Sequence, residues 1–131
     1  MSQENVEIVR AGIHAYNRRD WDALLKHAAP DFVWDMSRAI GPQRGVYKLA
    51  DLRSFLEDLA TTFEFHRFEA HEFIEAGEHV VVPTTAYARG RDGIEVEART
   101  ATVYTFRDGV ITRMTMYQGR QEALEAAGLS E

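Results

Sequence analysis

The hydrophobic period of this chain changes near residue 65, and that change constrains its fold more than any other feature. Before it, apolar residues recur every three or four positions, as at Val6, Val9 and Ile13, which is typical of amphipathic helices. After it, apolar and polar residues alternate, and Asp-Gly pairs at 92–93 and 108–109 separate the alternating runs. The sequence therefore predicts an α+β fold in which helices precede an antiparallel sheet.

The first half of the chain is predicted to hold three helices. The apolar stripe of the first helix includes Tyr16, and the second helix is N-capped by Asp20 and must end by Pro30. The third helix begins near Leu49. Between the second and third helices, the sequence predicts a short strand over 32–36 and a loop over 37–45.

The second half is predicted to form a sheet and one short helix. Four strands are expected, at about 65–74, 79–89, 94–107 and 110–118, and the helix is expected at 121–127. The connections are too short for crossovers, so neighbouring strands should pair antiparallel as a meander. With no repeat or linker in the sequence, residues 1–131 are expected to form one domain.

Composition excludes several classes of function. The formal charge of −6 argues against a nucleic-acid partner, because affinity for phosphates comes mostly from Lys and Arg. The chain has no Cys, which removes disulfides, thiolate catalysis and cysteine metal sites. It also has no apolar run of about 18 residues, so no membrane partner is expected. We expect a cytoplasmic protein.

The predicted strand over 94–107 has two different faces. One face includes Tyr104 and Phe106, carries no charge, and should pack against the helices. The opposite face carries Ala101 and Val103 beside Val81 of the neighbouring strand. Such an apolar outer face favours a homodimer. The alternative is that scattered exposed apolar residues have no function, which is ordinary in monomers.

Several short segments carry a resemblance that covers essentially the whole chain. They are YNRRDW at 16–21, PDFVW at 30–34, Gly45 followed by DLRSFL at 51–56, FRDGVI at 106–111 and the stretch over 117–129. In this order they resemble the SnoaL-like group of the nuclear transport factor 2-like superfamily. The resemblance implies three helices wrapped against a curved antiparallel sheet, forming a cone with a pocket at its open end.

Members of this superfamily include ketosteroid isomerases, polyketide cyclases, dehydratases, epoxide hydrolases and proteins without known activity, so the resemblance does not select a reaction. Isomerases and cyclases of this type need a carboxylate that moves a proton. Asp35 is the candidate base, since it lies in the short strand where isomerase-like members carry theirs. Strand alternation opposes this role, because Trp34 and Met36 share one face and Asp35 then points away from the pocket unless a bulge intervenes.

Tyr16 and His14 complete the candidate catalytic set. Tyr16 follows Gly12, the position of the isomerase tyrosine, by one helical turn, but it is explained equally well as part of the core stripe. His14 or His66 is a candidate acid–base group, because imidazole titrates near pH 6.5. A solvated surface position is the simpler interpretation of both. Thr102 stands where the isomerase has its protonated acid, so the usual steroid isomerase site is absent.

The inward positions of the sheet and the third helix predict the wall of a pocket. The candidate substrate-binding residues are Trp34, Met36, Phe55, Leu59, Thr84, Thr102, Tyr104, Met114 and Met116. This mostly apolar wall suits a small hydrophobic molecule. The alternative is that the same side chains fill a solid core, which methionines do well. No metal-ligand spacing is present, and no metal or cofactor is expected.

Two functions remain open from the sequence. The first is binding of a hydrophobic or polyketide-like molecule, with or without cofactor-independent isomerisation, cyclisation or dehydration. The second is a non-catalytic homodimeric binding or dimerisation module of the same fold. The absence of an acid at Met36, Thr102 and Met116 counts for the second function. An epoxide hydrolase fits poorly, because Arg99 and Glu97 lie on the expected outer face.

Overall fold

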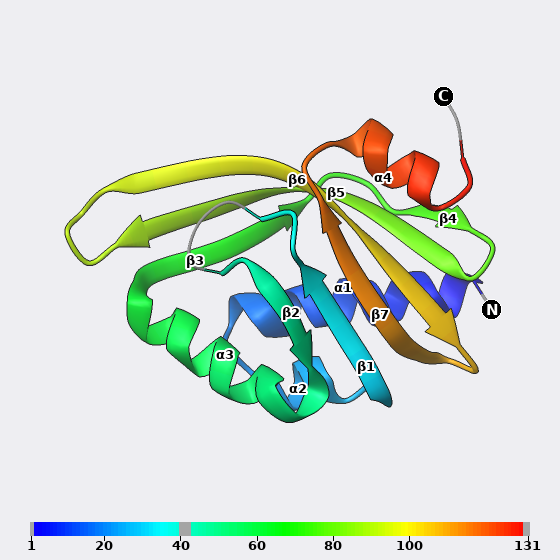
Figure 1. Ribbon diagram of the computed structural model, residues 1–131, viewed down its shortest axis with the longest axis horizontal. Helices are drawn as coiled ribbons and strands as arrows, with labels where there is room; N and C mark the ends of the chain where they lie inside the picture. The colour runs from blue at the N-terminus through cyan, green and yellow to red at the C-terminus, as the bar shows by residue number, and fades with distance from the viewer. Residues whose placement is uncertain (1, 40–42, 130–131) are drawn as a thin grey trace.

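In the computed structural model, which describes residues 2–39 and 43–129, the helices of the first half of the chain wrap one side of a curved sheet (Figure 1). The helices are α1 (Ser2–Asn17), α2 (Trp21–Leu25), α3 (Leu49–Thr62) and α4 (Arg120–Ala126). The strands are β1 (Ala28–Met36), β2 (Gly45–Lys48), β3 (Phe63–Ala70), β4 (Ile74–Ala76), β5 (His79–Gly90), β6 (Glu95–Arg107) and β7 (Val110–Tyr117). The predicted α+β class is confirmed.

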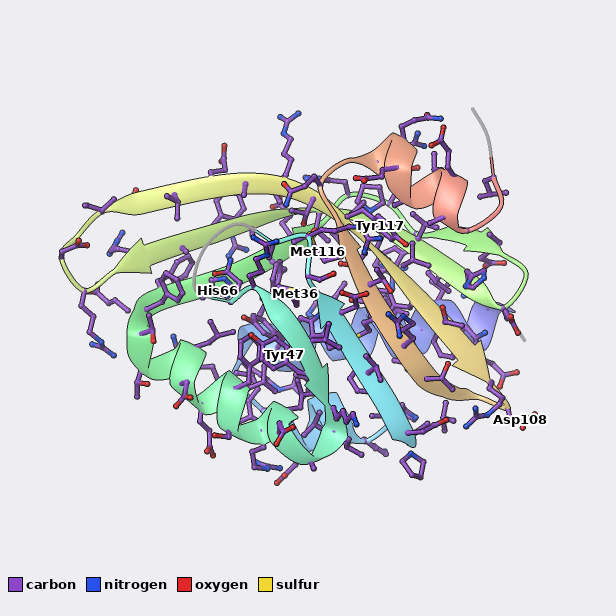
Figure 2. The ribbon with its side chains drawn as sticks, in the orientation of Figure 1. Met36, Tyr47, His66, Asp108, Met116 and Tyr117 are labelled. Atoms are coloured by element: carbon purple, nitrogen blue, oxygen red, sulfur yellow. The ribbon has the colours of Figure 1, made fainter. Side chains whose placement is uncertain are left out.

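The sheet has the strand order β2-β1-β7-β6-β5-β3, and β4 also pairs with β5. Strands β5, β6 and β7 form the predicted antiparallel meander. Asp108 and Gly109 turn β6 into β7 with φ angles of 52° and 81°, the left-handed conformation that a tight hairpin of this type requires. Figure 2 shows Asp108 at the tip of this turn.

The pairing of β1 differs from the prediction, because β1 joins the sheet parallel to β7 and β2 extends it antiparallel to β1. The sequence predicted neither β2 nor the full length of β1, which includes Pro30. Nothing near β1 in the chain predicts its pairing with β7, since β7 comes more than seventy residues later. Residues 40–42 of the predicted loop lie outside the described residues.

The junction between α1 and α2 follows local chemistry. After α1, the Asp20 N–H donates to the Ala15 carbonyl and the Arg19 N–H donates to the Tyr16 carbonyl, with Arg19 at a φ of 59°. This is a Schellman arrangement, which ends the helix at Asn17, one residue after Tyr16. The Asp20 carboxylate then accepts from the Ala23 N–H at 3.1 Å, so the predicted N-cap of α2 is confirmed.

The main core lies between the inner face of the sheet and the helices α1 and α3; α1 passes behind β1 and β7 in Figure 1. The predicted inward face of β6 is present, because Tyr104 and Phe106 are buried in this core. Leu56 of α3 is completely buried and contributes to the same cluster. No helix among the described residues is long and apolar enough to cross a membrane.

A second, smaller core lies on the outer face of the sheet. Here Val81, Ala101 and Val103 pack under Ala123 and Leu124 of α4. The alternation along β6 predicts that these strand residues are exposed and available to a second subunit. The expectation of exposure was wrong at these positions, because α4 folds back after β7 and covers them with its own apolar side.

Candidate functional site

A cavity of about 240 Å³ lies between α1, α2 and the inner face of the sheet. Strands β1, β6 and β7 provide much of its wall, and Leu52 of α3 and Phe68 of β3 also reach it. Helix α1 leaves space at Gly12, where an added Cβ would have only Leu24 Cδ1 within 4 Å, at 3.8 Å. The missing side chain of Gly12 therefore helps to keep the cavity open.

The structure brings part of the predicted wall to this cavity. The lining residues that the sequence analysis named as substrate-binding are Trp34, Thr84, Thr102, Tyr104 and Met114. Met36 and Met116 are buried in the main core and do not line the cavity. Phe55 stacks against Tyr47 with ring centroids 3.9 Å apart, and Figure 2 shows Tyr47 on β2 beside α3. Leu59 is half-buried on α3 and also lies outside the wall.

Tyr16 lines the cavity, and its hydroxyl is hydrogen-bonded to His66 Nδ1 at 2.5 Å. The His66 ring lies among the aromatic rings of Tyr16, Phe63 and Phe68. Burial raises the pKa of Tyr16, with the Arg19 cation opposing it. Burial, assisted by Arg19, lowers the pKa of His66 to about 4. At neutral pH the pair therefore consists of a phenol and a neutral imidazole.

The free energy of unfolding should depend on His66 between pH 6.5 and pH 4. In the unfolded chain the His66 imidazole is protonated below about pH 6.5, whereas in the folded protein it stays neutral down to about pH 4. The free energy of unfolding therefore decreases as the pH falls through this window. The loss attributable to His66 should approach about 3 kcal/mol. Denaturant unfolding of the wild type and His66→Asn from pH 7 to pH 4 measures it, because asparagine keeps a polar partner for Tyr16 without titrating. Parallel curves for the two proteins would contradict the prediction.

His14, the other candidate on α1, is exposed and does not line the cavity. Helix geometry explains this, because His14 lies off the stripe that Val9, Ile13 and Tyr16 direct toward the sheet. The lining residues with a basic side chain are Arg18, Lys26 and His27, from the segment that connects α1 to β1. No lining residue is an aspartate or a glutamate.

Asp35 lies on the outer face of the sheet and not in the cavity wall. Its Oδ2 accepts from Arg113 Nη2 at 2.8 Å, and its Oδ1 accepts from the Ser37 N–H at 3.0 Å and the Ser37 hydroxyl at 2.6 Å. Burial acts to raise the pKa of Asp35, but the hydrogen bonds from Ser37 and Arg113 outweigh it and hold the pKa below its usual value. Strand alternation placed this side chain correctly, and the geometry does not supply a base at Asp35.

A family model described as the SnoaL-like domain matches residues 9–114 of the chain. The protein belongs to the SnoaL-like family. Among solved structures, TerC co-crystallised with polyporic acid is 26% identical over 95% of this chain and 98% of its own, with a TM-score of 0.79. An NTF2-like protein from Burkholderia xenovorans LB400 is also 26% identical, over 97% and 98% of the two chains, with a TM-score of 0.75.

A third structure supports the fold alone. It is a protein with a ketosteroid isomerase-like fold from Catenulispora acidiphila in complex with trimethylamine, which is 18% identical over 94% of this chain and 93% of its own, with a TM-score of 0.75. Among curated proteins, no sequence matches significantly. The SnoaL-like fold has relatives that include polyketide cyclases and ketosteroid isomerases, so the reaction must be argued from the cavity itself.

Asp35→Asn should destabilise this SnoaL-like protein without changing the cavity. The substitution removes the negative charge that accepts hydrogen bonds from Arg113 and Ser37. The expected decrease in the free energy of unfolding is about 1–3 kcal/mol at pH 7. Because the pKa of Asp35 is lowered, its contribution is complete above the ordinary carboxyl pKa of 3.8 and is lost as the pH falls through the lower folded-state value. Urea unfolding at pH 7 and pH 3 measures the change in free energy.

The matched control is Asp31→Asn, since Asp31 pairs with Arg107 in an exposed position on the same strand and should change stability little. A loss of ligand binding in a well-folded Asp35→Asn protein would contradict the placement of Asp35 outside the site.

Several parts of the cavity wall were not predicted from the sequence. They include Phe32, Ile111 and Leu24 of α2. The alternation through Trp34 was a sufficient signal for Phe32, two residues earlier on the same face. The residues at the α1–α2 junction carried no such signal, because their approach to β1 and β7 depends on how the helices pack. Among the described residues, no group of His, Cys, Asp or Glu could hold a metal ion.

Proposed function

We propose that this SnoaL-like protein binds a small, mostly apolar molecule in the cavity between α1 and the sheet. The observation that carries the proposal is the cavity itself, about 240 Å³ in volume and lined mainly by aliphatic and aromatic side chains. The similarity to TerC, which was co-crystallised with polyporic acid, supports a small-molecule ligand. The wall residues Trp34, Thr84, Thr102, Tyr104 and Met114 would contact it.

Titration with indane, a bicyclic hydrocarbon, tests this proposal. Trp34 lines the cavity and Trp21 does not, so Trp21→Phe leaves a single fluorescent reporter in the wall. Saturable quenching with a Kd on the order of 0.1–1 mM is expected for a ligand of this size. An increase in Tm with ligand concentration should accompany it. A fluorescence signal that never saturates, together with an unchanged Tm, would show that the wall encloses no binding site.

A second candidate function is cofactor-independent proton transfer, such as isomerisation, cyclisation or dehydration of a hydrophobic or polyketide-like substrate. The observation that favours it is the hydrogen bond between Tyr16, in the cavity wall, and His66 behind it. When the substrate gives a proton to the Tyr16 oxygen, the phenolic proton passes to His66 Nδ1, and the reverse transfer returns a proton to another substrate atom. Tyr16 thus takes the role of acid and base that the sequence analysis gave to Asp35.

Tyr16→Phe separates the enzyme from a non-catalytic binding module. An enzyme of this kind should lose about 10²–10⁴ in rate while it still binds indane. In a binding module, the same variant should change binding modestly, and neither the wild type nor the variant should catalyse a reaction. The readout is hydrogen–deuterium exchange at the α-carbon of an added cyclic ketone, followed by NMR with the wild type and the variant.

The homodimer and the cytoplasmic location stay parts of this proposal. The fold family often forms dimers, which supports pairing through the outer face of the sheet. Since α4 covers Val81, Ala101 and Val103, the paired surface would be the remainder of that face. Light scattering on the purified protein tests the dimer, and a mass equal to one chain at all concentrations would exclude it.

A further inference from the structure

Apart from its tyrosines, the ionisable side chains of the cavity wall are all basic. They are Arg18, Lys26 and His27, and none of the described lining residues is an aspartate or a glutamate. This bias runs against the composition of the chain, in which 21 Asp and Glu outnumber 15 Lys and Arg. A wall of one sign in an acidic protein therefore has a cause other than composition.

The basic residues lie where the cavity approaches solvent. Of the described lining residues, only Ala11, Arg18 and Lys26 are exposed, and the others are buried or half-buried. Lys26 and His27 follow α2, and the Ile111 N–H donates to the His27 carbonyl at 2.8 Å, which fixes this segment beside β7. The cavity thus has an apolar interior and a basic opening, between α1 and the segment that leads into β1.

Lys26 is the cation at this opening that no described acidic residue pairs with. The acidic residues nearest to it in the sequence are engaged elsewhere. Asp20 caps α2 and lies 3.5 Å from Arg18, and Asp22 pairs with Arg53 of α3. The Lys26 ammonium therefore keeps its three N–H donors for an anion at the opening.

We propose that the ligand is an organic acid whose apolar body fills the cavity and whose carboxylate stays at the opening beside Lys26. Arg18 and His27 line the same cavity and supply further N–H donors. This inference rests on the proposed function, because it requires an apolar body in the cavity, and it goes further by naming the charge of the ligand. A carboxylate at the opening keeps part of its hydration, so the cost of burying a charge does not cancel its attraction to the cations.

The test compares three probes that share the same two rings, namely indane, indane-2-carboxylate and 2-aminoindane. At pH 7 the carboxylate is negative and the amine is positive. We expect the carboxylate to bind about fivefold more tightly than indane and the ammonium about fivefold more weakly, because two charges about 4 Å apart in water change affinity by such a factor. Quenching of Trp34 in the Trp21→Phe protein gives each Kd. The differences should shrink from about 20 mM to about 500 mM NaCl, since salt screens exposed charges.

Lys26→Glu is the deciding variant, and Lys48→Glu is its matched control. Lys48 is exposed at the N-cap of α3 and does not line the cavity, so the two variants change the net charge equally. Lys26→Glu should weaken binding of the carboxylate at least about tenfold, because an attraction becomes a repulsion, and should leave indane affinity nearly unchanged. Lys48→Glu should change the affinity of neither probe.

Three outcomes would contradict the inference. Equal affinities for the carboxylate and the ammonium, or tighter binding of the ammonium, would overturn the acidic ligand while indane binding still upheld the proposed function. A preference for the carboxylate that Lys26→Glu and Lys48→Glu reduce alike would overturn the role of the basic opening. Failure of all three probes to bind would overturn the proposed function and the acidic ligand together.

Discussion

Gly12→Leu is expected to close the cavity to ligands while the protein stays folded. Gly12 lies in the cavity wall, and the nearest atom to a Cβ added there is Leu24 Cδ1 at 3.8 Å, an ordinary van der Waals distance. The leucine side chain would then occupy space that a ligand needs. A ligand forced in beside it must overpack the wall at a cost of about 1–3 kcal/mol, which weakens Kd by a factor of roughly 5 to 150.

The measurement for Gly12→Leu is the indane titration, together with thermal unfolding. Because glycine is unfavourable inside a helix, the variant should unfold at the wild-type Tm or above it. Gly12→Ala is the control: it should gain about 0.5–1 kcal/mol in helix stability and keep most of the binding. Unchanged indane affinity in a folded Gly12→Leu protein would show that the ligand lies elsewhere.

Leu56→Ala is expected to cause the largest loss of stability among these variants. Leu56 is completely buried between α3 and the inner face of the sheet and does not line the cavity. Truncation removes buried methyl groups and leaves an empty space, at a cost of about 2–5 kcal/mol. Since small domains are stable by only about 5–15 kcal/mol, this loss should be plain in urea unfolding at 25 °C.

The control for Leu56→Ala is Leu59→Ala, three residues later on the same helix, where the side chain is half-buried. The loss in the free energy of unfolding should be clearly smaller, because folding buries less apolar surface of Leu59 than of Leu56. If the two substitutions cost the same, α3 does not present Leu56 to the core in the way described. Binding of indane by the folded fraction of either variant should be retained, since neither residue lines the cavity.

Elements that depend on near neighbours were predictable from the sequence. The Asp108-Gly109 hairpin, the Asp20 cap and the inward face of β6 all follow from residues a few positions apart. Alternation also indicated that Asp35 points away from the helices, although its chemistry favoured it as a base. Choosing the residue by its chemistry alone was the weaker argument, because side-chain direction in a strand is set by the backbone.

The partners of distant residues were decided only by the tertiary structure. Tyr16 and His66 are 50 positions apart, and Asp35 and Arg113 are 78 apart. Their meeting depends on how α1 packs against β3 and on the parallel pairing of β1 with β7. Such contacts depend on the packing of the whole core, so the residues next to each partner in the sequence do not predict them.

By itself, the sequence determined the α+β class, the antiparallel meander and the resemblance to the SnoaL-like family, because hydrophobic period and turn chemistry act over a few residues. Only the tertiary structure decided that a cavity is open beside Gly12 and that α4 covers the outer apolar residues. Those features depend on how the packed elements fill space, and a local sequence pattern does not specify that.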